Sequence, residues 1–187
     1  MVDWSANSRP KKGADSIWIS DACGWSVNPS TRAEAMKLIQ ERTRQGHWLV
    51  AFDFPMGIPF GVCGFEDWRA LWQKVAAGLQ DKNNNQNNRW ELAAFLNQQH
   101  QTRFWGVPES RPYLSSKRAH EAGDWEWRAG DPRGAQSAWK LLGVGSVGSQ
   151  MLTGIAHLER WRQQDPASFA VWPFESPDAR IVVSETW

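Results

Sequence analysis

Residues 48–52 form a continuous apolar run, Trp-Leu-Val-Ala-Phe, which constrains the fold more than any other segment. Its length is that of one strand, and an uninterrupted apolar strand is typical of a sheet covered on both faces. An amphipathic helix is predicted before it, because Thr31 and Glu34 have capping-box spacing and Gly46 can end the helix. A helix that leads into a buried strand indicates an α/β fold.

Further elements are predicted on both sides of this run. Five other segments have strand character: residues 1–5, 15–21, 25–27, 169–174 and 181–184. Three other segments have helical character: residues 68–79, a segment that starts at 88, and a long segment that follows the glycine-rich turn at 143–148. Residues 102–133 are rich in proline and glycine, so no regular structure is expected there.

Length and charge limit the function classes. A chain of 187 residues can bury its own core, so we expect one domain, residues 1–187, with a helical insertion at about 60–133. The formal net charge is +1, which excludes a strong overall field that would attract nucleic acid or an anionic membrane. Cys23 and Cys63 lack the spacing of a zinc site or a disulfide framework, and no apolar stretch approaches the ~20 residues of a membrane span. These features predict a cytoplasmic protein without a membrane partner.

Fourteen tryptophans are many for 187 residues, so some must reach the surface. Their spread along the chain favours use in the core and in interfaces over a dedicated strip that stacks bases or sugars. Trp68 and Trp72 share one helical stripe with Leu71, Val75 and Leu79, and we expect this stripe to be buried. If the protein forms a homo-oligomer, we expect its subunits to contact each other through a Trp-rich surface or through the C-terminal surface.

Four carboxylates follow strand-like segments. Asp3 and Asp53 each end an apolar run, so we expect their side chains to face one crevice at the same end of a sheet, close enough for one cation to touch both. Glu175 and Glu185 each follow a strand-like segment near the end of the sequence. Solvated surface acids or helix caps are the alternative interpretation of all four residues.

The glycine-rich turn has the spacing GxGxxG at Gly143, Gly145 and Gly148. A dinucleotide site is not predicted there, because residues 138–142 look helical and no βαβ unit surrounds the turn. The turn leads into a helix whose N-terminal N–H groups can hold an anion, so Gly145 and Ser146 are candidates for cofactor binding. A helix cap is the alternative role of Ser146.

Other polar residues are candidates for phosphate or ligand binding. Ser5 follows Asp3 closely and either orients a ligand or makes a turn. Arg111, Arg118 and Arg128 lie in the proline-rich segment and are candidates to clamp phosphate oxygens.

Five short segments together carry a resemblance: residues 3–6 (Asp-Trp-Ser-Ala), 53–57 (Asp-Phe-Pro-Met-Gly), 143–150, 171–175 (Val-Trp-Pro-Phe-Glu) and 184–187. They resemble a bacterial family of ribonuclease H-like proteins related to the group catalogued as domain of unknown function 429. The resemblance implies a mixed sheet flanked by helices, with the insertion after the fourth strand. It also implies that Asp3, Asp53 and Glu175 hold Mg²⁺ or Mn²⁺, with Glu185 as a further catalytic carboxylate.

The resemblance implies a metal-dependent phosphoryl-transfer enzyme, a nuclease or another phosphodiester hydrolase, with nucleic acid or a nucleotide as partner. Two alternatives stay open: a non-catalytic scaffold that binds protein or nucleic acid, and a nucleotide-binding phosphotransferase related to actin-like ATPases. In such domains a further helix usually follows the last strands. We therefore expect this sequence to be the N-terminal part of a longer natural protein, so that it lacks a C-terminal continuation, or a second subunit to cover the sheet face that would otherwise expose apolar surface.

Overall fold

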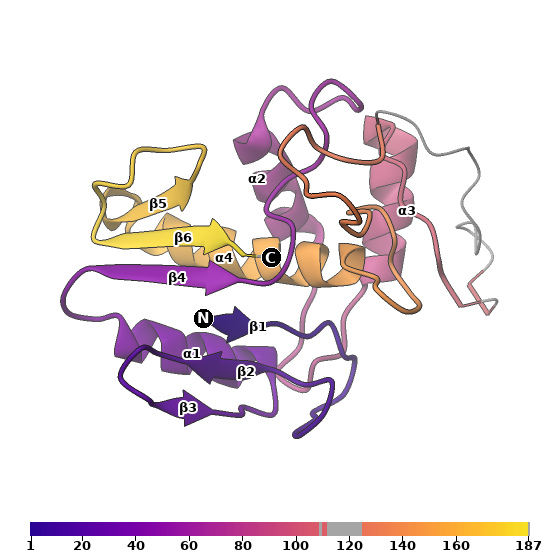
Figure 1. Ribbon diagram of the computed structural model, residues 1–187. Coiled ribbons are helices and arrows are strands. Elements are labelled where there is room, and N and C mark those ends of the chain that lie inside the picture. The colour runs from indigo at the N-terminus through magenta and orange to yellow at the C-terminus, as the bar shows by residue number, and fades with distance from the viewer. Residues whose placement is uncertain (109, 112–124, 187) are drawn as a thin grey trace. The chain divides into compact units, whose positions relative to one another are not determined.

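The computed structural model describes residues 1–108, 110–111 and 125–186 (Figure 1). The chain divides into two compact units. Unit 1 comprises Met1–Phe54, Gln80–Asn87 and His157–Trp187, and unit 2 comprises Pro55–Leu79 and Asn88–Ala156. The insertion expected at about 60–133 lies in unit 2, except that residues 80–87 belong to unit 1.

Unit 1 contains the strands β1 (Val2–Asp3), β2 (Trp18–Ser20), β3 (Ser26–Val27), β4 (Trp48–Phe52), β5 (Phe169–Trp172) and β6 (Ile181–Glu185). It also contains helix α1 (Arg32–Arg42) and the short 3-10 helix η1 (Pro166–Ser168). Unit 2 contains α2 (Trp68–Gly78) and α3 (Arg89–His100), and α4 (Gly148–Gln164) begins in unit 2 and ends in unit 1. The predicted α/β class and order of elements are confirmed.

The six strands form one mixed sheet in the order β3-β2-β1-β4-β6-β5. Strand β4 is parallel to β1 and to β6, and β5 is parallel to β6, whereas β2 and β3 are antiparallel to their neighbours. The carboxyl ends of β1, β4, β6 and β5 therefore lie at the same edge of the sheet. Figure 1 shows these four arrows pointing the same way.

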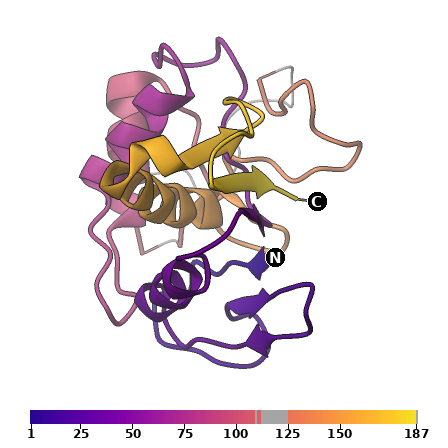
Figure 2. The same cartoon turned by 90° about the vertical axis from the view of Figure 1, so that its left-hand side faces the viewer.

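One face of the sheet is covered within unit 1. The pairing register places Val2, Val50, Phe52, Val171 and Val183 on this face, and all five side chains are buried. Helix α1 and the unit 1 part of α4 pack on it, and Figure 2 shows both helices on the same side of the strands. Complete burial of an aliphatic side chain contributes about 1.5–3 kcal/mol, so this face supplies much of the core energy.

The opposite face of the sheet is partly exposed. Leu49, which the alternation of side chains places on this face, is 67% exposed, and Trp18 and Trp172 are also exposed. The expectation that the run at residues 48–52 is buried on both faces is therefore wrong. An apolar composition does not require two covering layers, and here α1 and the end of α4 lie on one side only.

Helix α1 begins as the capping box predicts, because Glu34 N–H donates to Thr31 Oγ1 at 3.2 Å. The buried residues Ala35, Met36 and Ile39 include the apolar positions that the sequence identified. The helix ends at Arg42, earlier than Gly46 predicts, where the Thr43 hydroxyl donates to the Ile39 carbonyl at 2.9 Å.

Helix α2 confirms the predicted buried stripe in unit 2. Leu71, Trp72, Val75 and Leu79 are buried, and Trp68 is half-buried. The indole N–H of Trp72 donates to the Met56 carbonyl at 2.8 Å, so its one polar group is satisfied inside the core.

Residues 138–142 are not helical, which corrects the sequence interpretation. This segment contains a turn and an isolated bridge to Trp105, whose N–H donates to Trp139 O at 3.0 Å and whose carbonyl accepts from Leu141 N at 2.9 Å. A side chain at Gly148 would place its Cβ 2.5 Å from the Ala138 carbonyl oxygen, so the turn into α4 requires glycine there. Among the described residues, no helix has the length and apolar character needed to cross a membrane.

Candidate functional site

Asp3 and Asp53 lie together at the carboxyl ends of β1 and β4. These strands are parallel neighbours, and Val2 lies opposite Phe52. Asp3 follows Val2 and Asp53 follows Phe52, so both aspartates reach the same edge of the sheet. The two carboxyl groups are close enough for Asp3 to raise the pKa of Asp53. The backbone N–H of Trp4 also donates to Asp53 Oδ1 at 2.7 Å. Both aspartates therefore lie at strand ends on the same edge of the sheet, and binding of one cation by both side chains stays a prediction.

Burial raises the pKa of Asp53 to about 7. The hydrogen bond from Trp4 opposes this shift, and the charge of the neighbouring Asp3 adds to it. Near neutral pH Asp53 therefore exchanges a proton with the solvent, and above this range its carboxyl group is charged. Asp3 is exposed, so the pair is accessible from outside.

The chemistry of the pair fits a small, hard divalent cation. Mg²⁺ prefers oxygen ligands and is commonly held by one or two carboxylates, with water and substrate phosphate completing its shell. Within the described residues there is no group of three or more His, Cys, Asp or Glu side chains arranged to hold a metal ion. Asp3 and Asp53 therefore suit a cation that is held by two protein carboxylates rather than by three or four.

Glu185 is not brought to this pair. It lies opposite Phe52 in the β4–β6 register, and Phe52 lies opposite Val2 on the covered face. Asp3 and Asp53 each come one residue later, and a shift of one residue moves a side chain to the other face. The residue of β6 that shares the partly exposed face near Asp53 is Ser184, which pairs with Ala51.

Glu175 is also directed elsewhere. Its Oε2 accepts a hydrogen bond from Val171 N at 3.0 Å, and its own N–H donates to the Val171 carbonyl at 2.9 Å. Strand β5, which leads to Glu175, is the edge strand and is separated from β4 by β6. The Glu175 carboxylate thus closes the turn after β5.

The other predicted binding residues occupy turns. Ser5 Oγ accepts from Asn7 N at 3.3 Å and donates to the Asp15 carbonyl at 3.4 Å, which matches the turn alternative. Gly145 and Ser146 lie in unit 2, where Ser146 N–H donates to Gly143 O at 3.0 Å within the turn before α4. Cofactor binding by these residues stays a prediction.

Two of the three predicted phosphate-clamping arginines are engaged in ion pairs. Arg111 is paired with Glu91, and Arg128 contacts Asp131 at 2.6 Å. Arg118 lies outside the described residues.

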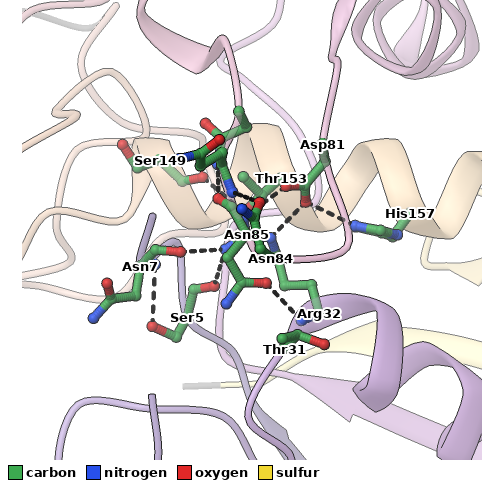
Figure 3. Close-up of polar contacts among 12 residues, drawn as sticks. Ser5, Asn7, Thr31, Arg32, Asp81, Asn84, Asn85, Ser149, Thr153 and His157 are labelled. Atoms are coloured by element: carbon green, nitrogen blue, oxygen red, sulfur yellow. Dashed lines mark hydrogen bonds and ion pairs between the residues drawn. The ribbon is translucent and has the colours of Figure 1, made fainter. Parts of the chain in front are cut away.

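A buried network that the sequence did not indicate holds the loop after Asp3 (Figure 3). The side chain of Arg32 is 1% exposed, and its Nε and Nη2 donate to the two carboxylate oxygens of Asp81 at 2.6 and 2.8 Å. Its Nη1 donates to the carbonyls of Ser5 and Asn7, both at 2.9 Å. Arg32 therefore ties the chain that follows Asp3 to a distant segment.

Asp81 is ionised at neutral pH because of its partners. Burial alone would raise the pKa of Asp81, but hydrogen bonds from Arg32 and His157 lower it to about 2. His157 Nε2 lies 2.9 Å from Asp81 Oδ2, and its ring centroid lies 5.7 Å from that of Trp4, the residue that contacts Asp53. The network thus supports the acidic pair from the covered side of the sheet.

The asparagine-rich segment at 83–88, which reads as a low-complexity polar loop, contributes a buried residue to this network. Asn85 has a left-handed backbone with φ of 68°, a conformation that asparagine tolerates better than most residues. Its Oδ1 accepts from Arg32 N at 2.9 Å, and its carbonyl accepts from Arg32 Nη2 at 2.8 Å. Low complexity hid this role, because neither periodicity nor charge distinguishes Asn85 from its neighbours.

Unit 1 also contains a cavity of about 280 Å³ whose lining includes Trp48, Leu49 and Val50 of β4, together with Ile39 and Arg42 of α1. It lies at the amino end of β4, whereas Asp53 follows the carboxyl end. The cavity is therefore separate from the acidic pair.

Comparisons with models of known protein families, with curated proteins and with solved structures found no match to this chain. The ribonuclease H-like resemblance therefore stays an expectation. The function has to be inferred from the geometry of the site itself.

Proposed function

We propose that this protein is a divalent-metal-dependent phosphoryl-transfer enzyme, a nuclease or another phosphodiester hydrolase, that acts at Asp3 and Asp53. The observation that carries the proposal is the pair of neighbouring carboxylates at the ends of two parallel strands, β1 and β4, on one edge of the sheet. Two neighbouring carboxylates repel each other when both are charged. A bound cation offsets this repulsion, so such a pair is suited to hold one. The ribonuclease H-like resemblance implies the same reaction class.

Asp3 and Asp53 would hold Mg²⁺ or Mn²⁺, which, when bound, supplies activation of water and stabilisation of charge on the phosphoryl group. The Trp4 N–H fixes one oxygen of Asp53, so this carboxylate is oriented before a ligand arrives. Asp3 is exposed and leaves the pair open to an extended substrate. Arg32 holds the backbone of Ser5 and Asn7 and thereby limits movement of the chain beside Asp3.

A second candidate function is a metal-free hydrolase in which the same pair works as a general acid and base. The pKa of about 7 for Asp53 favours it, because proton transfer is most efficient when the pKa of the catalytic group is close to the working pH. The two candidates differ in their response to added cations.

Binding of Mn²⁺ at pH 8, followed by electron paramagnetic resonance, tests the proposal. We expect Asp3→Asn and Asp53→Asn each to weaken Mn²⁺ binding by at least about tenfold, because each removes one of two charged ligands. Glu185→Gln is the matched control, since it also follows a strand but lies on the other sheet face, and it should bind as the wild type does.

Hydrolysis of a chromogenic phosphodiester with and without Mn²⁺ separates the two candidates. Activity that requires the metal and is lost in both aspartate variants supports the proposal. Metal-independent activity lost in the same variants supports acid–base hydrolysis. Absence of both Mn²⁺ binding and activity in the wild type would contradict both candidates and leave the scaffold interpretation.

A further inference from the structure

Two N–H donors in unit 2 are buried and have no acceptor in the part of the chain that the structure describes. They are Nε of Arg103 and Nε1 of Trp105. Both side chains are half-buried, so the donors lie below the surface of the unit while the residues still reach it. Buried polar groups in proteins are nearly always hydrogen-bonded, and an exception calls for a ligand, ion or water that accepts the bond.

The two donors belong to residues on either side of Phe104 in one segment. Trp105 pairs through its backbone with Trp139 and Leu141, which holds this segment in place. Phe104, between the two donors, is buried, and its ring centroid lies 5.3 Å from that of Trp139. Arg103 and Trp105 are each less buried than Phe104, so the two donor residues reach closer to the surface than the core contact between them.

Each of the two donor residues takes part in a cation–π contact. The Arg103 guanidinium carbon lies 4.7 Å from the ring centroid of Trp125, and the Lys140 ammonium lies 5.9 Å from that of Trp105. Trp125 is held in place because its carbonyl accepts from the indole N–H of Trp139 at 2.9 Å. Lys140 Nζ donates to the Val144 carbonyl at 2.6 Å, and an ammonium has two further N–H donors.

We propose that Arg103, Trp105 and Lys140 form a binding site for a phosphate group. The donors without partners are all N–H groups, so the ligand must offer acceptors. Two cationic side chains complement a dianionic phosphate better than a singly charged carboxylate. The site does not depend on the function proposed for Asp3 and Asp53. The phosphate group could belong to free inorganic phosphate or to a nucleotide.

Titration with inorganic phosphate, followed by the indole N–H resonances in a ¹H–¹⁵N correlation spectrum, tests the site directly. We expect the Trp105 indole N–H to move downfield in a saturable manner at millimolar phosphate, because it gains an acceptor. The Trp127 indole N–H, which already donates to the Ala135 carbonyl at 2.9 Å, should not move. Absence of a saturable shift at Trp105 in the wild type would overturn the proposal, whatever the variants do.

Variants show which donors bind. Trp105→Phe removes the indole N–H and keeps an aromatic ring, and we expect it to weaken phosphate binding by about tenfold. Arg103→Gln should weaken binding by more, because it also removes the charge. Trp127→Phe is the matched control and should bind as the wild type does. Equal affinity in Trp105→Phe, Arg103→Gln and the wild type would contradict the assignment of these donors.

The same titration separates the sources of the ligand. Tighter binding of adenosine monophosphate than of inorganic phosphate identifies a nucleotide site with the aromatic rings as its base-stacking surface, and equal binding identifies a site for the phosphate group alone. Acetate should compete weakly. Acetate binding as tight as phosphate binding would contradict the choice of phosphate.

Discussion

At the scale of single residues, Asp53 shows how position changes the chemistry of an ordinary side chain. Its carboxyl group is removed from water, accepts one backbone hydrogen bond and lies beside another carboxyl group. Its pKa is about 7 in the folded protein, compared with 3.8 in the unfolded chain. Between these values the folded protein holds the extra proton, so the contribution of Asp53 to the free energy of unfolding falls as the pH rises and is lost above about pH 7.

The variant Asp53→Asn tests this linkage. Asparagine keeps an oxygen that accepts from Trp4 N–H and offers an N–H₂ to Asp3, but it has no charge. We expect it to be more stable than the wild type at pH 8, on the order of 1–2 kcal/mol after discounting for solvent screening, and to differ little at pH 4. Urea unfolding at both pH values measures the difference. The exposed Asp178→Asn is the control and should change stability little at either pH.

At the scale of elements, the two ends of helix α1 offer a natural comparison. Arg32 at its start pairs with the buried Asp81, whereas Arg42 at its end pairs with Asp21 at 2.5 Å and is partly exposed. The first pair joins segments far apart in the chain, and the second lies at the surface. A buried pair is costly to break, while a surface pair contributes little.

We therefore expect Arg32→Lys to lower the free energy of unfolding by about 2–4 kcal/mol, and Arg42→Lys by less than about 1 kcal/mol. Lysine keeps the charge but cannot reach Asp81 and the two backbone carbonyls at once. Hydrogen exchange at the amides of residues 4–7 should also accelerate in Arg32→Lys alone. Similar losses in both variants would contradict the role given to the buried network.

Strand β4 supports a second comparison at this scale, between neighbouring residues on opposite faces. Leu49→Ser should change stability by less than about 0.5 kcal/mol, because this side chain already contacts water. Val50→Ala should cost about 1–3 kcal/mol, because it leaves a gap against α1. Chemical denaturation measures both, and a large loss in Leu49→Ser would show that another body covers this face in solution.

At the scale of the whole molecule, cation binding should be linked to folding stability. If Mn²⁺ binds the folded Asp3–Asp53 pair and not the unfolded chain, a concentration of about 100 times the dissociation constant adds about 2.7 kcal/mol. For a chain of this length that is roughly 5–10 °C in the unfolding midpoint. The gain should be larger at pH 8 than at pH 6, since protons compete for Asp53. At the same Mn²⁺ concentration, Asp3→Asn should show at most about half of the gain, because its binding is at least about tenfold weaker.

The sequence by itself determined the features that depend on neighbours along the chain. The Thr31 cap, the buried stripe of α2 and the apolar run of β4 follow from local hydrogen bonds and from helical or strand periodicity. The meeting of Asp3 and Asp53 was also predictable, because each ends an apolar strand and parallel strands end at one edge.

Tertiary structure alone decided the rest. The β4–β6 register places Glu185 on the face opposite Asp53, and register depends on how distant strands align rather than on either strand's composition. The exposure of Leu49 depends on which side of the sheet α1 and the end of α4 pack. Arg32 meets Asp81 and Asn85 across 49 and 53 residues, and no local pattern encodes a contact between segments so far apart.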